Sequence, residues 1–166
     1  GTLPAEITWN VQLNLDPQIQ NLSITSLSKS IDILFVVDNS SSMSAEQLEI
    51  KNRIKGFIDK IQNIDWQIGV TSTDPSKSSS WGDGQLRIFG NYKQILTPQD
   101  SNLDTQLGNA VYMGTNGSGD ERGINATYRV IQRALSDTTS GQAKLIRKDA
   151  ALSVVLISDE DECSNG

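Results

Sequence analysis

The chain has 166 residues, 36% of them hydrophobic, and its 20 acidic and 14 basic side chains give a formal net charge of -6. An acidic chain is a poor partner for a phosphate backbone, which argues against nucleic-acid binding. The lack of histidine excludes His-dependent catalysis and imidazole metal sites, and the single cysteine, Cys163, excludes an internal disulfide. No apolar run approaches the roughly 18 residues that a transmembrane segment needs. Oxygen atoms would have to hold any metal, as they hold Mg²⁺, Ca²⁺ and Mn²⁺.

Residues 1–30 form a polar lead-in with one alternating stretch, residues 7–13 (ITWNVQL). Alternation with a period of two predicts a half-buried strand, either at an edge or in a preceding module. The composition changes sharply at Ile31, so we predict a single domain over residues 31–166.

Strands and helices are predicted to alternate along this domain. Residues 31–37 (IDILFVV) are apolar and β-branched, which is typical of a strand covered on both faces. A capping box, with Ser44 as N-cap and Gln47 returning to it, predicts a helix over 45–62. Residues 64–73 read as a second strand, and 152–157 (LSVVLI) as a further buried strand.

The segments between these elements are less regular. We predict a loop over 76–84, a short strand over 86–89, and little periodic structure over 97–119, with a turn at 114–119. A second helix follows, with apolar residues on one face: Ile124, Tyr128, Ile131 and Leu135. The alternation predicts an α/β fold with a mainly parallel central sheet flanked by helices.

Two of the predicted strands end in an aspartate. Asp38 opens the pattern Asp38-x-Ser40-x-Ser42, and Asp159 lies just beyond the 152–157 strand. Ligands of open α/β sheets bind at the carboxyl ends of the strands. Alternate residues of a tight loop can direct one carboxylate and two hydroxyls at one divalent cation. Without a cation, two neighbouring carboxylates would repel each other.

The segments IDILFVVDNSSSM and VVLISDEDE resemble the von Willebrand factor type A domain with its metal-ion-dependent adhesion site, in its bacterial secreted or lipid-anchored form. The resemblance covers roughly residues 31–166 and implies a Rossmann-like fold. It also implies that Asp38, Ser40, Ser42 and Asp159 are metal ligands.

The family's middle ligand, usually a threonine, would lie in the loop TNGSGDERG. Asp120 takes its place by counting back from Gly123, with Glu121 and Thr115 as the alternatives. Asn39, Ser41 and Thr115 are candidates for contact with the bound ligand.

The resemblance implies a function as well. An ion with one open coordination position, Mg²⁺ or else Ca²⁺ or Mn²⁺, would bridge to an acidic oxygen donor of a protein or glycan partner. We therefore predict a metal-dependent adhesion module and not an enzyme. We expect it to be secreted or at the cell surface, with an outer-membrane-associated or periplasmic location as the alternative. The alternatives are a Mg²⁺-dependent phosphohydrolase with Asp38 as nucleophile and a metal-free scaffold.

Two further expectations concern the end of the chain. Domains of this family continue beyond the Asp159 strand, so we expect the 152–157 strand to lie at an exposed edge, or under something outside residues 31–166, in a truncated fold. Four acidic neighbours should make Cys163 a poor nucleophile.

Overall fold

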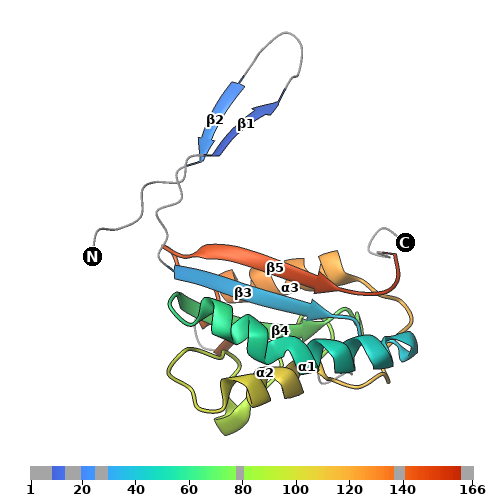
Figure 1. Cartoon of the computed structure of the whole chain (residues 1–166). Coiled ribbons are helices and arrows are strands. Elements are labelled where there is room, and N and C mark those ends of the chain that lie inside the picture. The colour runs from blue at the N-terminus through green and yellow to red at the C-terminus, as the bar shows by residue number, and fades with distance from the viewer. Residues whose placement is uncertain (1–8, 14–19, 25–29, 78–80, 137–140, 162–166) are drawn as a thin grey trace.

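Three apolar segments form a parallel sheet in the order β4-β3-β5, as Figure 1 shows. The computed structural model describes residues 9–13, 20–24, 30–77, 81–136 and 141–161. Strand β3 (Ser30–Val37) is central, between β4 (Asp65–Ser72) and β5 (Ala151–Ile157). Every strand pair in this sheet is parallel, which confirms the predicted α/β, Rossmann-like class.

Helices cover both faces of the sheet. Helices α1 (Ser44–Ile61) and α2 (Leu103–Val111) lie on one face, and α3 (Gly123–Ser136) lies on the other. Short 3-10 turns complete the set: η1 (Ser41–Met43), η2 (Gly90–Tyr92) and η3 (Gly141–Lys144).

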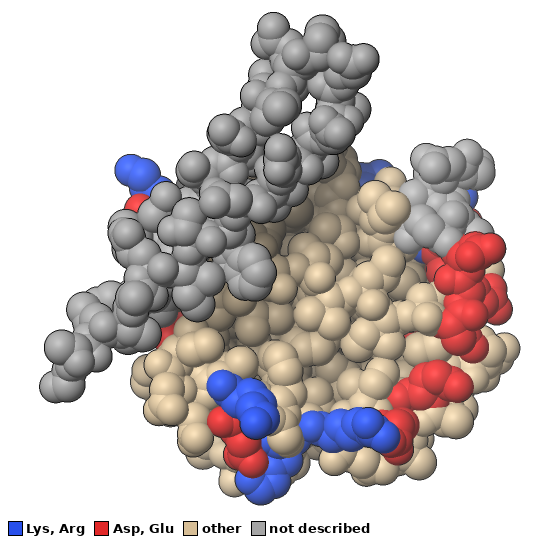
Figure 2. Space-filling view, turned by 45° about the horizontal axis from the view of Figure 1, so that its top comes forward, with Lys and Arg blue, Asp and Glu red and all other residues tan. Residues whose placement is uncertain are grey.

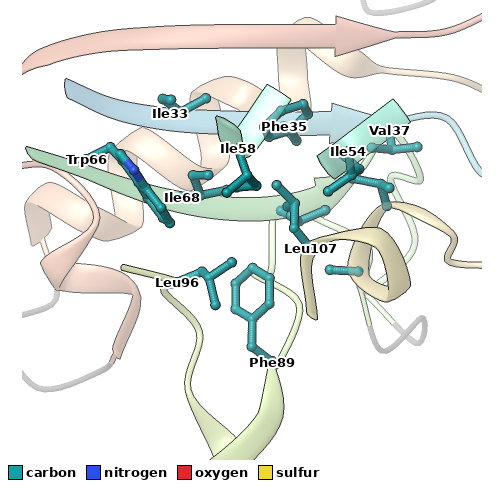
Figure 3. Packing of buried hydrophobic residues seen from close by; sticks show 13 residues of the cluster. Ile33, Phe35, Val37, Ile54, Ile58, Trp66, Ile68, Phe89, Leu96 and Leu107 are labelled. Carbon is teal, nitrogen blue, oxygen red and sulfur yellow. The ribbon is translucent and has the colours of Figure 1, made fainter. Parts of the chain in front are cut away.

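Strand β3 is buried on both faces because its side chains alternate between two apolar clusters. Ile33, Phe35 and Val37 belong to the cluster on the α1 and α2 side, shown in Figure 3. Leu34 and Val36 belong to the cluster on the α3 side. Burial of each such side chain contributes roughly 1.5–3 kcal/mol relative to exposure, so β3 anchors the position of the loop that follows it.

An ion-pair network fixes the opposite, amino end of β3. Asp32 is 1% exposed, and its carboxylate accepts hydrogen bonds from the backbone nitrogen and Nε of Arg147, at 2.6 and 2.7 Å. The same guanidinium reaches Asp65 at the start of β4, at 2.8 Å. The buried carboxylate at this end of the sheet, Asp32, therefore has an internal cation.

Sequence and structure disagree in several places. Helix α2 was not predicted, because its nine residues sit in a stretch with little periodicity. Residues 86–89 are not a strand, although the Arg87 nitrogen donates to the Val70 carbonyl on the outer side of β4. The predicted capping box is wrong: α1 has no side-chain N-cap bond, and Gln47 points elsewhere.

The predicted apolar stripe of the second helix exists, but it is not the buried face. Small side chains of α3 face the sheet instead: Gly123, Ala126, Val130 and Ala134. Tyr128 and Leu135 are more than half exposed. Strand β5 pairs only with β3 among the described residues, as expected of a strand at the edge of the sheet. The prediction that residues 152–157 form a buried strand is wrong, because every residue of β5 is partly or fully exposed.

Strands β1 (Trp9–Leu13) and β2 (Gln20–Ile24) belong to the polar lead-in. They pair with each other as an antiparallel hairpin, with Trp9 opposite Ile24. Among the described residues, neither strand is hydrogen-bonded to a strand of the main sheet. The predicted strand over 7–13 is thus present in its described part. Cys163, and our expectation for its reactivity, lie outside the described residues.

Candidate metal centre

The parallel register of β3 and β5 brings the two predicted metal loops together. Val37 is paired with Ile157, and the Asp38 nitrogen donates to the Ile157 carbonyl at 2.9 Å. The residues that follow the two strands therefore start from adjacent positions at the carboxyl edge of the sheet.

Asp38 is fully buried, and both of its carboxylate oxygens accept a hydrogen bond. The Ser40 nitrogen donates to Oδ1 at 2.8 Å, and the Ser158 hydroxyl donates to Oδ2 at 2.6 Å. The first bond closes a tight turn over residues 38–40, while the second ties the β3 loop to the β5 loop. Sequence reasoning identified Asp38 and Ser40 but not Ser158.

A row of three oxygen atoms continues from this turn. The hydroxyls of Ser40 and Ser42 are 3.0 Å apart, and the Ser42 hydroxyl donates to Asp159 Oδ1 at 3.2 Å. Ser40 is buried, whereas Ser42 and Asp159 are exposed. The predicted residues thus form one cluster that is anchored inside the fold and open to solvent on one side.

Gln47 holds a second loop against this cluster. Its Nε2 donates to the Asp38 carbonyl at 2.8 Å and to the Gly114 carbonyl at 3.0 Å, and its Oε1 accepts from the Gly114 nitrogen at 3.1 Å. The side chain is completely buried. Its position on the first turn of α1 resembled a capping box, so this role could not be predicted from the sequence.

Glu121 is the carboxylate that the second loop contributes. It is 2% exposed, and neither of its carboxylate oxygens has a hydrogen-bond partner among the described residues. Burial, the nearby charge of Asp38 and the proximity of Glu160 together raise the pKa of Glu121 from 4.5 to about 7, with burial the largest cause. At neutral pH this group is a desolvated acid facing other acids.

The other candidates in the second loop lie differently. Asp120 is 44% exposed at its side chain and forms a two-pronged ion pair with Arg122, with both oxygens 3.0 Å from Nε. Thr115 is half-buried. Of the three candidates for the middle ligand, only Glu121 combines burial with proximity to Asp38.

The two remaining candidates for contact with a bound ligand, Asn39 and Ser41, differ in solvent exposure. Ser41 is exposed on η1. Asn39 is 6% exposed, and its carbonyl accepts from the Gly117 nitrogen at 2.8 Å. A Cβ at Gly117 would come within 2.3 Å of Asn39 Oδ1, so any larger residue there would force the Asn39 side chain to move. Asn39 therefore packs the two loops together inside the fold.

The donor set of the cluster is mixed. In the described part of the chain, no group of three or more Asp, Glu, His or Cys side chains is placed to hold a metal ion. Ligation here would therefore depend on serine hydroxyls as well as carboxylates. Oxygen ligands at 2.1 Å from an octahedral ion lie about 3.0 Å from their neighbours. The separations of 3.0 and 3.2 Å along the Ser40, Ser42 and Asp159 row fit that spacing.

Comparison with known proteins gives no match to any family model and none to a curated protein sequence. Among the described residues, no helix is long and apolar enough to cross a membrane.

Proposed function

We propose that this chain is a metal-dependent adhesion or ligand-binding module similar to the von Willebrand factor type A domain. The proposal is supported by the Asp38-x-Ser40-x-Ser42 pattern, by the Asp159 loop beside it, and by a parallel sheet that brings both loops to one edge. We propose that the protein is secreted or located at the cell surface.

Glu121 is the observation that carries the proposal. A buried carboxylate ordinarily has a hydrogen-bond or ionic partner, because desolvation without one costs several kcal/mol. Asp32 in the same fold has such a partner, whereas Glu121 lies beside Asp38 and has no hydrogen-bond partner among the residues that the structure describes. A divalent cation between these loops would supply the missing positive charge.

The residues that would hold the ion follow from the cluster. Ser40, Ser42 and Asp159 would provide the row of oxygens, and Glu121 would face them from the second loop. Asp38, through its bonds to Ser40 and Ser158, would fix the row and supply negative charge. Such hard oxygen donors suit Mg²⁺, Ca²⁺ or Mn²⁺.

When bound, the ion would act as a positive centre at the surface of an acidic chain. Exposure of Ser42 and Asp159 leaves one side of the cluster accessible to a partner. An acidic oxygen donor of a protein or glycan would complete the coordination there. Binding of this kind needs no reaction step, so we propose a binding module and not an enzyme.

Calorimetric titration with Mg²⁺, Ca²⁺ and Mn²⁺ tests the proposal. We expect one ion per chain for the wild type, no binding for Asp38→Ala and weaker binding for Ser40→Ala. Ser136→Ala, on the far end of α3, is the matched control and should bind as the wild type does. No heat of binding for any of the three ions would contradict the metal site.

Two further assays separate the classes of function. A surface carrying a glutamate peptide should retain the ion-loaded protein, and its glutamine counterpart should not. Turnover of an aryl phosphate in Mg²⁺ that disappears in Asp38→Ala would instead support a phosphohydrolase. If the wild-type protein binds neither ion nor peptide, the metal-free scaffold is the interpretation that remains.

A further inference from the structure

A cavity of about 330 Å³ lies beside β4, across the sheet from β5. Its walls come from β4 itself, from the segment over residues 88–97, and from the last residue of η3. No residue that lines it belongs to the candidate metal centre, which lies beyond the carboxyl ends of β3 and β5. Cavities that bind small ligands begin at about this volume, so the space suits a small molecule.

The charge of this cavity is opposite to that of the chain. Lys93 and Lys144 line it, and no acidic side chain of the described residues does, although the chain carries a net charge of -6. Lys93 forms an ion pair with Asp100. Lys144 is exposed and has no ion pair within the described part of the chain. A ligand that carries a carboxylate would therefore find a counter-ion here, and a cationic ligand would not.

Two glutamine amides in the cavity wall are available for hydrogen bonding. The buried Oε1 of Gln67, on β4, has no partner among the described residues. A half-turn about the last side-chain bond, which is soft in glutamine, exchanges the two ends of this amide, so Gln67 can meet a ligand hydroxyl as acceptor or as donor. Gln94 makes one long bond, 3.4 Å from its Nε2 to the Leu86 carbonyl, and its oxygen can accept another. These groups suit a ligand with several hydroxyls.

Tyr92 lies at the mouth of the cavity in a backbone conformation that tyrosine rarely adopts. Its φ angle is 60°, in the left-handed region, and its side chain is 93% exposed. Burial of the ring therefore does little to offset the cost of this conformation, and such costs are typical of binding sites. Ile88, 47% exposed, lines the same cavity. The ring and the aliphatic side chain offer an apolar surface to the flat face of a ligand.

We propose that this cavity binds an acidic saccharide, a sugar ring that carries a carboxylate, such as a hexuronic acid. Tyr92 and Ile88 pack against the apolar face of the ring. The amides of Gln67 and Gln94 bind its hydroxyls, and Lys144 pairs with its carboxylate. The site goes beyond the proposed metal centre and does not depend on it, because the two share no residue.

Nuclear magnetic resonance titration of the full chain with methyl glucuronide, in EDTA, tests this site apart from any metal-dependent binding. We expect shifts of the backbone amides over residues 88–97, with a dissociation constant on the order of 1 mM for a ligand of this size. Methyl glucoside, which lacks the carboxylate, should bind up to about five-fold more weakly. Acetate and a glutamate peptide should not shift these amides.

Two variants assign the roles. Lys144→Gln should remove the preference for the glucuronide over the glucoside, and Lys148→Gln, at an exposed lysine outside the cavity, is the matched control that should keep it. Tyr92→Gly should lose binding of both sugars without loss of stability, because glycine accepts the positive φ. Tyr128→Ala, at an exposed tyrosine on α3, should bind as the wild type does.

The same titrations can overturn the proposal. Absence of shifts in the wild type would do so, as would equal shifts with acetate or the glutamate peptide, or undiminished binding in Tyr92→Gly. Binding of the glucuronide that requires Mg²⁺ and disappears in Asp38→Ala would assign the saccharide to the metal centre and also contradict this site. Binding in EDTA that persists in Asp38→Ala would support the cavity even if the metal centre binds no ion.

Discussion

A buried acid lies at each end of β3, and the two acids differ in what neutralises their charge. At the amino end, Asp32 is 1% exposed and is bound by Arg147, 2.7 Å away. At the carboxyl end, Glu121 is 2% exposed beside Asp38, and its carboxylate has no hydrogen-bond partner in the described part of the chain. The nearest arginine in sequence, Arg122, pairs with Asp120 instead.

The difference separates a structural ion pair from a proposed binding site. A buried carboxylate that has its own arginine contributes to the fold and needs nothing from solution. One that faces other acids destabilises the fold until a cation arrives. We therefore expect cations to bind at the carboxyl end of β3 and to have no effect on the ion pair at its amino end.

The largest effect is expected at the amino end. Arg147→Met removes the guanidinium but keeps most of the side-chain volume, leaving the charge of Asp32 buried. Breaking a buried pair in this way costs about 3–5 kcal/mol of unfolding free energy. Urea unfolding measures the loss, and the double variant with Asp32→Asn should recover part of it. If Arg147→Met lost only as much unfolding free energy as the break of an exposed ion pair, the two ends of β3 would not differ as we describe.

A somewhat smaller effect is expected for Glu121 in the metal-free protein. Its pKa is about 7 in the fold and lies near 4.5 when the chain is unfolded, so the native state holds a proton that the unfolded state has lost. Stability in EDTA should therefore fall as pH rises from 4.5 to 7, by up to about 3 kcal/mol.

Glu121→Gln isolates this contribution. The variant should lose that part of the pH dependence, and at pH 8 in EDTA it should be more stable than the wild type. Saturating Mg²⁺ should remove the difference, because the cation then neutralises Glu121 in the wild type. Identical pH profiles of the two proteins in EDTA would show that Glu121 is not a desolvated acid.

The smallest effect is expected for Asp120, the other acid of the same loop. Its pair with Arg122 is partly exposed, and such pairs contribute about 0–1 kcal/mol. Asp120→Asn should therefore change neither stability nor ion affinity by more than a few-fold. Calorimetry on both loop variants decides between the candidates: loss of binding in Asp120→Asn alone would assign the middle ligand to Asp120.

The sequence was sufficient to predict the three strands of the main sheet, but β2 was not predicted and residues 86–89 were wrongly predicted to be a strand. Strand β3 is an unbroken apolar run, and the Asp38 pattern follows it directly, so both the element and the edge it reaches are determined locally. Helix α1 begins and ends within one residue of its predicted bounds because its apolar spacing is regular.

The features that sequence reasoning missed depend on contacts between distant segments. Gln47 looks like part of a helix cap and instead joins the loop at Asp38 to the loop at Gly114, which is 67 residues away from Gln47. Glu121 and Asp120 are chemically alike and adjacent, and only the direction of the loop separates the buried acid from the paired one. The buried face of α3 consists of small residues, whereas the apolar stripe that periodicity detects is exposed.

Thermal unfolding with and without divalent cations tests the metal site most directly. At about 100 times the dissociation constant, an ion that binds only the native state stabilises it by roughly 2.7 kcal/mol. That corresponds to a rise of several degrees in Tm for a domain of this size. We predict this rise in Mg²⁺ or Ca²⁺ relative to EDTA for the wild type and for Arg147→Met, and none for Asp38→Ala. Wild-type curves that coincide in EDTA, Mg²⁺ and Ca²⁺, or an undiminished rise in Asp38→Ala, would contradict the account.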